Sequence, residues 1–120
     1  MSVFKTYKGA RIDLQHYKGK SIEGYEFEVF DNDDTAFDLS AYDDIIIKIF
    51  EKRHGTELLE FSEGNGDIER DSPAGNSITW NADMTSMDLF PKFYYHECYG
   101  VIDESPEINE LIFHGVFEMI

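Results

Sequence analysis

The chain has 120 residues, of which 42% are hydrophobic and 15% aromatic, so it can bury one core and lacks the composition of a disordered segment. Its 10 Lys and Arg residues oppose 25 Asp and Glu residues, and the net charge of −15 repels a phosphate backbone or an anionic membrane surface. We therefore expect a single domain over residues 1–120, with neither nucleic acid nor membrane as a partner.

The single cysteine, Cys98, excludes an intramolecular disulfide and a thiolate metal cluster. The N-terminal residues contain no apolar run of signal-peptide length, and no stretch of the sequence is long and apolar enough to span a membrane. We expect the chain to be made and folded in a cytoplasm.

Gly, Asn, Asp and Pro divide the chain at short intervals, and the apolar residues between them mostly alternate with polar ones. This pattern predicts about seven to nine short antiparallel strands. In chain order, the predicted strands cover residues 10–16, 22–30, 43–51, 57–61, 67–70, 77–81, 93–102 and 111–120.

Two of these strands have clearly assigned faces. In the first, Tyr25, Phe27 and Val29 share one face, while Glu26 and Glu28 share the other. That alternation predicts a strand with one solvated face. In the second, Ile45, Ile47 and Ile49 face one way, while Ile46 and Phe50 flank Lys48. Because it is the most apolar strand, it is predicted to lie at the centre of a sheet.

Local signals mark three features of the second half. The run Gly64-Asn65-Gly66-Asp67 predicts a hairpin that pairs residues 57–61 with 67–70, because Asn-Gly accepts the positive φ angles of tight turns. In the strand that follows, Ile78 and Trp80 are predicted to face the core. Residues 84–91 predict one helical turn, which Asp83 caps and Pro91 ends.

Strands at this spacing, without long helices between them, predict a two-sheet sandwich or a small barrel. We favour an immunoglobulin-like antiparallel β-sandwich. It lacks the antibody hallmarks, because Cys98 has no partner cysteine and Trp80 comes late in the chain. A short helical turn before a tyrosine-rich strand is nonetheless how many such sandwiches connect their fifth and sixth strands.

The two last strands are unusually aromatic. In residues 93–102, the burial preference of cysteine predicts that one set of side chains faces inward and the other outward. The inward set is Tyr94, Cys98 and Ile102, and the outward set is Tyr95, Tyr99 and Val101. Apolar residues on both faces exceed what one core requires, so this is where we expect a covered face or an interface.

The acidic run Asp31-Asn32-Asp33-Asp34-Thr35 resembles the start of a calcium loop, since hard cations bind several oxygens within one turn. The EF-hand pattern then fails, because Ala36 replaces the glycine of the sixth position and Tyr42 replaces the glutamate of the twelfth. We predict a solvated turn and no bound metal.

The other candidate reactive groups also lack a supporting pattern. The histidines, which follow no metal or catalytic spacing, are His16, His54, His96 and His114. The last two become neighbours if the final strands pair, although each is predicted to pack or to hydrogen-bond locally. Cys98 lies among aromatic residues in an acidic chain, which predicts a small buried hydrophobe rather than a reactive thiol.

Carboxylate pairs of the kind used by glycosidases occur at Glu26 with Glu28 and at Glu57 with Glu60, but both are predicted to lie on solvated faces. We therefore expect no enzyme, no catalytic residue and no cofactor. Exposed tyrosines and Trp80 offer a platform for stacking on sugar rings, and a carbohydrate-binding or adhesin-type module is the alternative to a structural protein.

Several segments carry a resemblance to a known family. They are Gly9-Ala10-Arg11-Ile12 through Phe27-Glu28-Val29-Phe30-Asp31, Ala36-Phe37-Asp38-Leu39-Ser40-Ala41-Tyr42-Asp43, Asn76-Ser77-Ile78-Thr79-Trp80, Leu89-Phe90-Pro91-Lys92-Phe93-Tyr94-Tyr95-His96-Glu97 and Leu111-Ile112-Phe113-His114-Gly115-Val116-Phe117. In this order the chain resembles the amino-terminal immunoglobulin-like domain of phage baseplate upper proteins and related tail modules. Lys92 stands where that family usually has glycine, and the family continues into long receptor-facing regions.

The resemblance implies a non-enzymatic structural protein of a tailed-phage virion, in its tail, baseplate or portal-proximal assembly. Its partners would be other virion proteins, and it would be a homo-oligomer or occur as repeated copies in a symmetric assembly. A strong negative charge would keep free subunits soluble until they dock onto a more basic partner.

Overall fold

The computed structural model of the chain describes residues 2–70, 75–83 and 89–120. Most of the predicted helical turn, residues 84–88, lies outside the described residues. The structure contains ten strands in the described ranges. They are β1 (Ser2–Tyr7), β2 (Ala10–Arg11), β3 (Leu14–His16), β4 (Ile22–Phe30), β5 (Asp44–Phe50), β6 (Glu57–Ser62), β7 (Ile68–Arg70), β8 (Ser77–Ala82), β9 (Lys92–Ile102) and β10 (Ile108–Met119).

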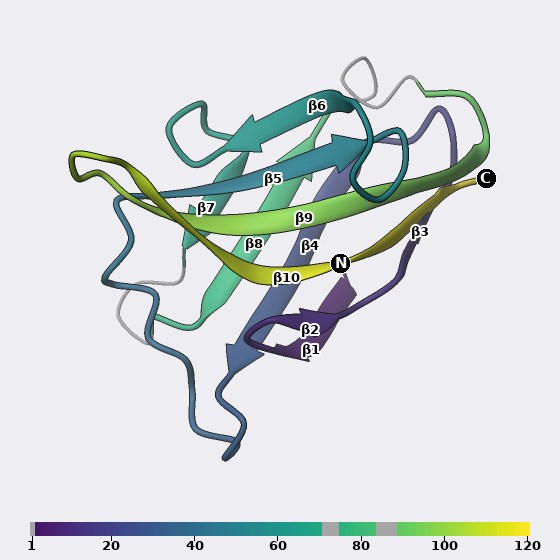
Figure 1. The fold of residues 1–120 in the computed structure, drawn as a ribbon. Helices are drawn as coiled ribbons and strands as arrows, with labels where there is room; N and C mark the ends of the chain where they lie inside the picture. The colour runs from purple at the N-terminus through teal and green to yellow at the C-terminus, as the bar shows by residue number, and fades with distance from the viewer. Residues whose placement is uncertain (1, 71–74, 84–88) are drawn as a thin grey trace.

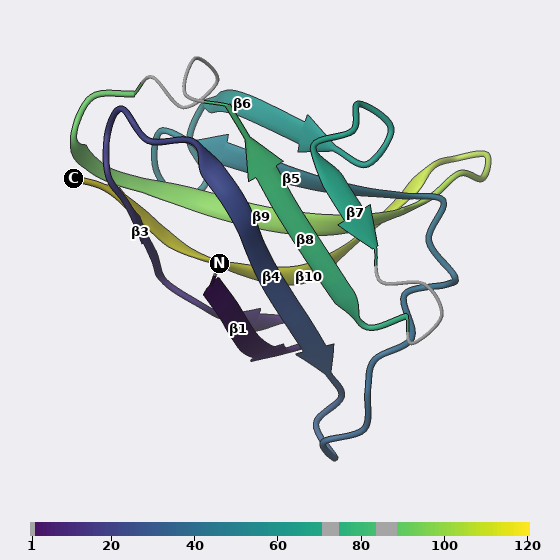
Figure 2. The same ribbon diagram turned by 180° about the vertical axis from the view of Figure 1, so that it is seen from behind.

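The strands form two sheets that pack face to face. Sheet A has the order β1-β4-β8-β7, and sheet B has the order β2-β10-β9-β5-β6, with β3 also paired to β10. Figure 1 shows sheet B in front of sheet A, and Figure 2 shows the molecule from the opposite side, with sheet A in front. In the immunoglobulin scheme, β4, β8 and β7 take positions B, E and D, while β10, β9, β5 and β6 take G, F, C and C′. The predicted all-β sandwich is confirmed, with ten strands in the described ranges where seven to nine were predicted.

The N-terminal segment adds strands that the sequence analysis missed or placed differently. β1 pairs in parallel with β4 at the edge of sheet A, and β2 and β3 pair in parallel with β10 at the edge of sheet B. Gly9, at φ 78°, lies between β1 and β2, where the chain passes from one sheet to the other. Both sheets are therefore mixed rather than purely antiparallel.

The strand predicted over residues 10–16 is interrupted at Ile12 and Asp13. Asp13 Oδ1 accepts a hydrogen bond from the Val116 amide at 2.9 Å, and the Ile12 carbonyl accepts one from His96 Nε2 at 2.7 Å. At these two residues, hydrogen bonds of the His96 and Asp13 side chains replace the backbone hydrogen bonds of a regular strand pair. The close approach needs Gly115, because a Cβ there would lie 2.0 Å from the Ile12 carbonyl oxygen.

The predicted hairpin of residues 57–61 with 67–70 is wrong. β6 pairs with β5 in sheet B, whereas β7 pairs with β8 in sheet A, so the turn around Gly66 crosses between the sheets. Phe61 and Ile68, on either side of this turn, are both buried in the common core. The sequence correctly predicted a turn at this position. The strand that pairs with β6 and the strand that pairs with β7 are decided by burial in the core.

The core lies between the sheets and is largely aromatic. Phe27 of sheet A stacks on Phe113 of sheet B, with ring centroids 4.5 Å apart. Trp80 meets Phe61 edge-on at 5.2 Å. The predicted inward residues of β4, β5 and β8 are confirmed as buried or half-buried: Tyr25, Phe27, Val29, Ile45, Ile47, Ile49, Ile78 and Trp80. β5 lies inside sheet B between β9 and β6.

A tyrosine corner marks the start of β9. The Tyr94 hydroxyl donates to the Phe90 carbonyl oxygen at 2.8 Å, while the Tyr94 side chain is buried in the core. Such a bond at the entry to the sixth strand is a recurring feature of immunoglobulin-like sandwiches. It anchors the chain where it enters sheet B.

Candidate protein-contact face

The strand register of sheet B gathers apolar side chains on its outer face, away from the core. Ile46 lies opposite Tyr99, and Phe50 lies opposite Tyr95. Seven of them are Ile46, Phe50, Tyr95, Tyr99, Val101, Leu111 and Val116, and the exposed Phe93 follows on the same side at the start of β9. We call these seven residues the outer face. Among the described strands, those of sheet A all pack against the opposite side of sheet B (Figure 1).

The predicted parity of residues 93–102 is confirmed. Tyr94 and Cys98 lie in the core, and Ile102 packs against it. Tyr95, Tyr99 and Val101 lie on the opposite side, where Tyr99 is half-buried while Tyr95 and Val101 are buried. The apolar residues of β9 that exceed the needs of the core therefore lie on the outward side of sheet B.

Part of the outer face is covered by its own neighbours. The Arg53 guanidinium lies 5.8 Å from the ring centroid of Tyr95, and the Tyr95 hydroxyl is hydrogen-bonded to His114 Nδ1. The Tyr99 hydroxyl donates to Glu97, and burial followed by this bond raises the pKa of Tyr99. The β5–β6 loop, which carries Arg53, and the β9–β10 turn lie at opposite ends of sheet B (Figure 1).

A hollow of about 300 Å³ opens on the outer face. It is lined by Ile46, Lys48, Phe50, Glu60, Tyr99, Glu107 and Asn109. Lys48 Nζ lies 3.0 Å from Glu57 and 3.7 Å from Glu60. Burial lowers the pKa of Lys48, but the two carboxylates outweigh it and the net shift is upward. The predicted carboxylate pair of Glu57 and Glu60 is thus ion-paired to Lys48, and Glu60 lines the hollow.

A second, acidic hollow of about 350 Å³ adjoins the first through Glu107 and collects five carboxylates. Its lining is Asp43, Asp44, Glu63, Gly64, Val101, Asp103 and Glu107. Asp43 Oδ2 accepts the Asp103 amide at 2.7 Å, and Asp44 Oδ1 accepts the Ile45 amide at 2.8 Å. Backbone amides therefore hold two of these side chains in place.

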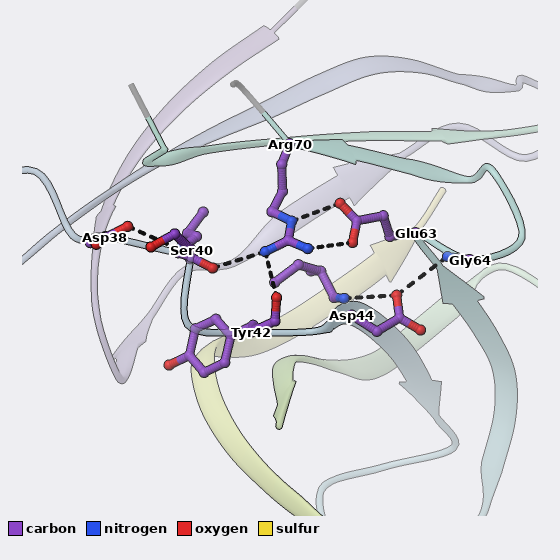
Figure 3. A network of polar contacts seen from close by, with 9 residues as sticks. Asp38, Ser40, Tyr42, Asp44, Glu63, Gly64 and Arg70 are labelled. Carbon is purple, nitrogen blue, oxygen red and sulfur yellow. Dashed lines mark hydrogen bonds and ion pairs between the residues drawn. The ribbon is translucent and has the colours of Figure 1, made fainter. Parts of the chain in front are cut away.

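Arg70 connects this region to sheet A. Its guanidinium binds both carboxylate oxygens of Glu63 at 2.7 Å and donates to the Leu39 and Tyr42 carbonyls at 2.8 Å each (Figure 3). The hydrogen bonds that Arg70 donates to Glu63 raise the pKa of Arg70 despite its partial burial. Sequence reasoning missed this clamp, and its only signal was an arginine that ends a short strand in an acidic chain.

The histidines are scattered rather than gathered into a site. His96 is buried, with its Nε2 bound to the Ile12 carbonyl, and burial lowers its pKa to about 4. His114 lies on the adjacent strand but faces outward, since His96 is opposite Gly115 in the register. His16 binds the Tyr25 hydroxyl and the Lys20 carbonyl, and His54 lies exposed in the β5–β6 loop.

The remaining candidate groups have structural surroundings. Cys98 is buried, and burial raises the pKa of its thiol, so the predicted role as a small buried hydrophobe is confirmed. In the acidic turn, Asp33 Oδ1 accepts the Thr35 amide at 3.1 Å, and Asp34 Oδ1 accepts the Tyr7 hydroxyl at 2.7 Å. Within the described ranges, no group of three or more His, Cys, Asp and Glu side chains is placed to hold a metal.

The fold and the outer face together define an immunoglobulin-like β-sandwich with one aromatic sheet face turned outward. The sequence matches no protein-family model and no curated protein. In the part of the chain that the structure describes, there is no helix with the length and apolarity that a membrane crossing needs.

Proposed function

We propose that this chain is a non-enzymatic structural module of a tailed-phage virion, which acts through protein-protein contacts in a tail, baseplate or portal-proximal assembly. Its partners are other virion proteins, and it occurs as repeated copies in the particle. The virion assignment rests on the resemblance described above.

The single observation that supports a contact role is the outer face. Tyrosine and phenylalanine are enriched at protein interfaces, where a rigid ring buries a large area at a low entropic cost. Tyr99 lies opposite Ile46 across β9 and β5, Phe50 follows Ile46 and Lys48 along the same face of β5, and the three apolar side chains are each only half-buried. A partner that covers them removes further apolar surface from water.

Mass spectrometry of purified particles tests the virion assignment. Particles from a host that carries the gene should contain the chain at a stoichiometry comparable to that of known tail proteins after density-gradient purification. A chain that is abundant in the lysate and absent from the particles would contradict the proposal. The genes next to it provide an independent test, since portal, tail-tube or fibre genes are expected there.

A second candidate, carbohydrate recognition, is favoured by a groove of about 670 Å³ at the edge of β3 and β10. Its lining is Phe4, Arg11, Asp13, Leu14, Gln15, Tyr25, Phe93, Val116 and Glu118. The Phe93 ring is 66% exposed, and planar polar groups lie around it, as in the Gln15–Glu118 hydrogen bond of 2.8 Å. Aromatic faces stack on the apolar faces of sugar rings.

A glycan array separates this candidate from the first. Specific binding that Phe93→Ala abolishes, and that the exposed control Tyr17→Ala leaves intact, would establish a sugar-binding module. An empty array, together with the chain in purified particles, would leave protein contacts as its role.

A further inference from the structure

The chemistry of the partner surface can be inferred from the charges that border the outer face, and this inference rests on the proposed function. The two hollows described above meet at Glu107, next to the β9–β10 turn. One is lined partly by apolar residues and the other by carboxylates. A partner that covers this end of sheet B must match both.

The partly apolar half, the hollow beside Tyr99, is also acidic, because its single cation is outnumbered by the carboxylates around it. Tyr99, Phe50 and Ile46 form its apolar wall. Lys48 lies among them with Glu57 and Glu60 within 4 Å, so its ammonium is already neutralised. A docking segment therefore meets three apolar side chains together with polar groups in this hollow.

The acidic half is strongly negative. Of its carboxylates, Glu63 is neutralised by Arg70, which binds both of its oxygens. Asp43, Asp44, Asp103 and Glu107 have no Lys, Arg or His within ion-pair distance among the described residues. The second oxygen of Asp44 points away from the Arg70 network in Figure 3.

These charges disfavour a second copy of the same face as the occupant. A self-complementary contact across a twofold axis brings identical patches together, so the two acidic hollows would lie close to each other. Each chain also carries a net charge of −15, which opposes association of two copies over longer distances. An unlike partner with the opposite charge has neither penalty.

We propose that the end of the outer face next to the β9–β10 turn docks a basic segment of an unlike virion protein. An arginine or lysine of that segment enters the acidic hollow beside Asp103 and Glu107, and an adjacent apolar side chain packs against Tyr99. Opposite charges across such an interface accelerate association and fix its register.

A short synthetic peptide that alternates Arg with Leu serves as the probe, and the same peptide with Glu in place of Arg is its control. The probe is titrated into the isotope-labelled full chain and followed by amide NMR signals. We expect saturable binding with a Kd below about 1 mM, and shifts confined to β5, β9 and residues 103–107. Raising the salt from about 50 to about 300 mM should weaken the binding.

Paired variants show whether the site or the overall charge is responsible. The double variant Asp103→Asn with Glu107→Gln should weaken binding about fivefold, as expected for the loss of two exposed ion pairs. Glu23→Gln with Glu69→Gln makes the same change in net charge on the exposed outer side of sheet A, and it should change binding by less than about twofold. Binding of the same peptide to Tyr99→Thr tests the contribution of the hollow that Tyr99 lines. Circular dichroism verifies that this variant is folded.

Several results would overturn the inference. They are no saturable binding by the Arg peptide, equal binding of the Glu peptide, shifts on other strands, or equal effects of the two paired charge variants. The proposed function is judged separately, because detection of the chain in purified particles does not depend on this peptide. A chain found in particles that fails the peptide test would retain the virion role and lose the basic docking site.

Discussion

At the residue scale, the Tyr94 hydroxyl is the clearest single polar contact of the fold. It donates to the Phe90 carbonyl at 2.8 Å and fixes the entry into β9. Tyr94→Phe removes this bond and little else, so we expect the free energy of unfolding to fall by about 1 kcal/mol. Urea denaturation of both proteins measures the difference. Tyr17→Phe, at an exposed ring, is the control, and equal stabilities of the Tyr94 variant and the unmodified chain would contradict the tyrosine corner.

His96 predicts a pH dependence of stability at the same scale. Burial lowers its pKa to about 4 from its ordinary value of 6.5, so between these values the unfolded chain binds a proton that the folded chain does not. Stability is therefore complete above about pH 6.5 and decreases as the pH falls toward 4, by on the order of 3 kcal/mol.

His96→Gln isolates this effect, because the amide can still donate to the Ile12 carbonyl but does not titrate in this range. Unfolding experiments at a series of pH values should show a shallower slope in the variant between about pH 6.5 and pH 4. His54→Gln, in the exposed β5–β6 loop, should keep the slope of the unmodified chain. Equal slopes for the His96 variant and the unmodified chain would disprove this role of His96.

At the element scale, the contact of β10 with the segment between β2 and β3 depends on the missing side chain of Gly115. A Cβ there would lie 2.0 Å from the backbone oxygen of Ile12, so one backbone segment must move. We expect Gly115→Ala to reduce the free energy of unfolding by about 3 kcal/mol, through overpacking and through weakening of the His96 bond to Ile12.

Gly64→Ala is the matched control, because a Cβ at that turn meets its nearest atom at an ordinary 3.6 Å. Thermal and urea unfolding of the two variants measure the difference between the two sites. A Gly115 variant as stable as the Gly64 variant would show that the residue 12–13 segment adapts without cost.

At the scale of the whole molecule, the Arg70 clamp ties together regions that are distant in the sequence. It joins β7 of sheet A to Glu63, which follows β6 of sheet B, and to the loop before β5. Arg70→Met leaves Glu63 and two carbonyl oxygens without their donor, and we expect a loss of about 2 kcal/mol in the free energy of unfolding.

Arg11→Met is the control for the Arg70 variant, since the Arg11–Asp13 pair at 2.9 Å lies in solvent and should contribute little. Hydrogen exchange adds a local measurement. Amides of β7 and of the loop before β5 should lose protection in the Arg70 variant, while those of β9 and β10 keep theirs. Uniform loss of protection would contradict a local clamp.

The sequence by itself determined the fold class, most of the strands and the faces of several of them. Alternation placed Phe27, Ile47 and Trp80 in the core, and the burial preference of cysteine assigned the inner side of β9 from Cys98. These predictions succeeded because side-chain periodicity and burial are local properties of a strand.

Only the tertiary structure decided which strands pair and which polar groups meet. The turn at Gly66 leads to the opposite sheet, β1 joins β4 in parallel, and Asp13 and His96 interrupt a strand whose pattern is continuous. The acidic hollow around Asp103 and Glu107 likewise draws on segments far apart in the chain. Such pairings depend on the burial of two surfaces at once, and no single stretch of sequence contains both of them.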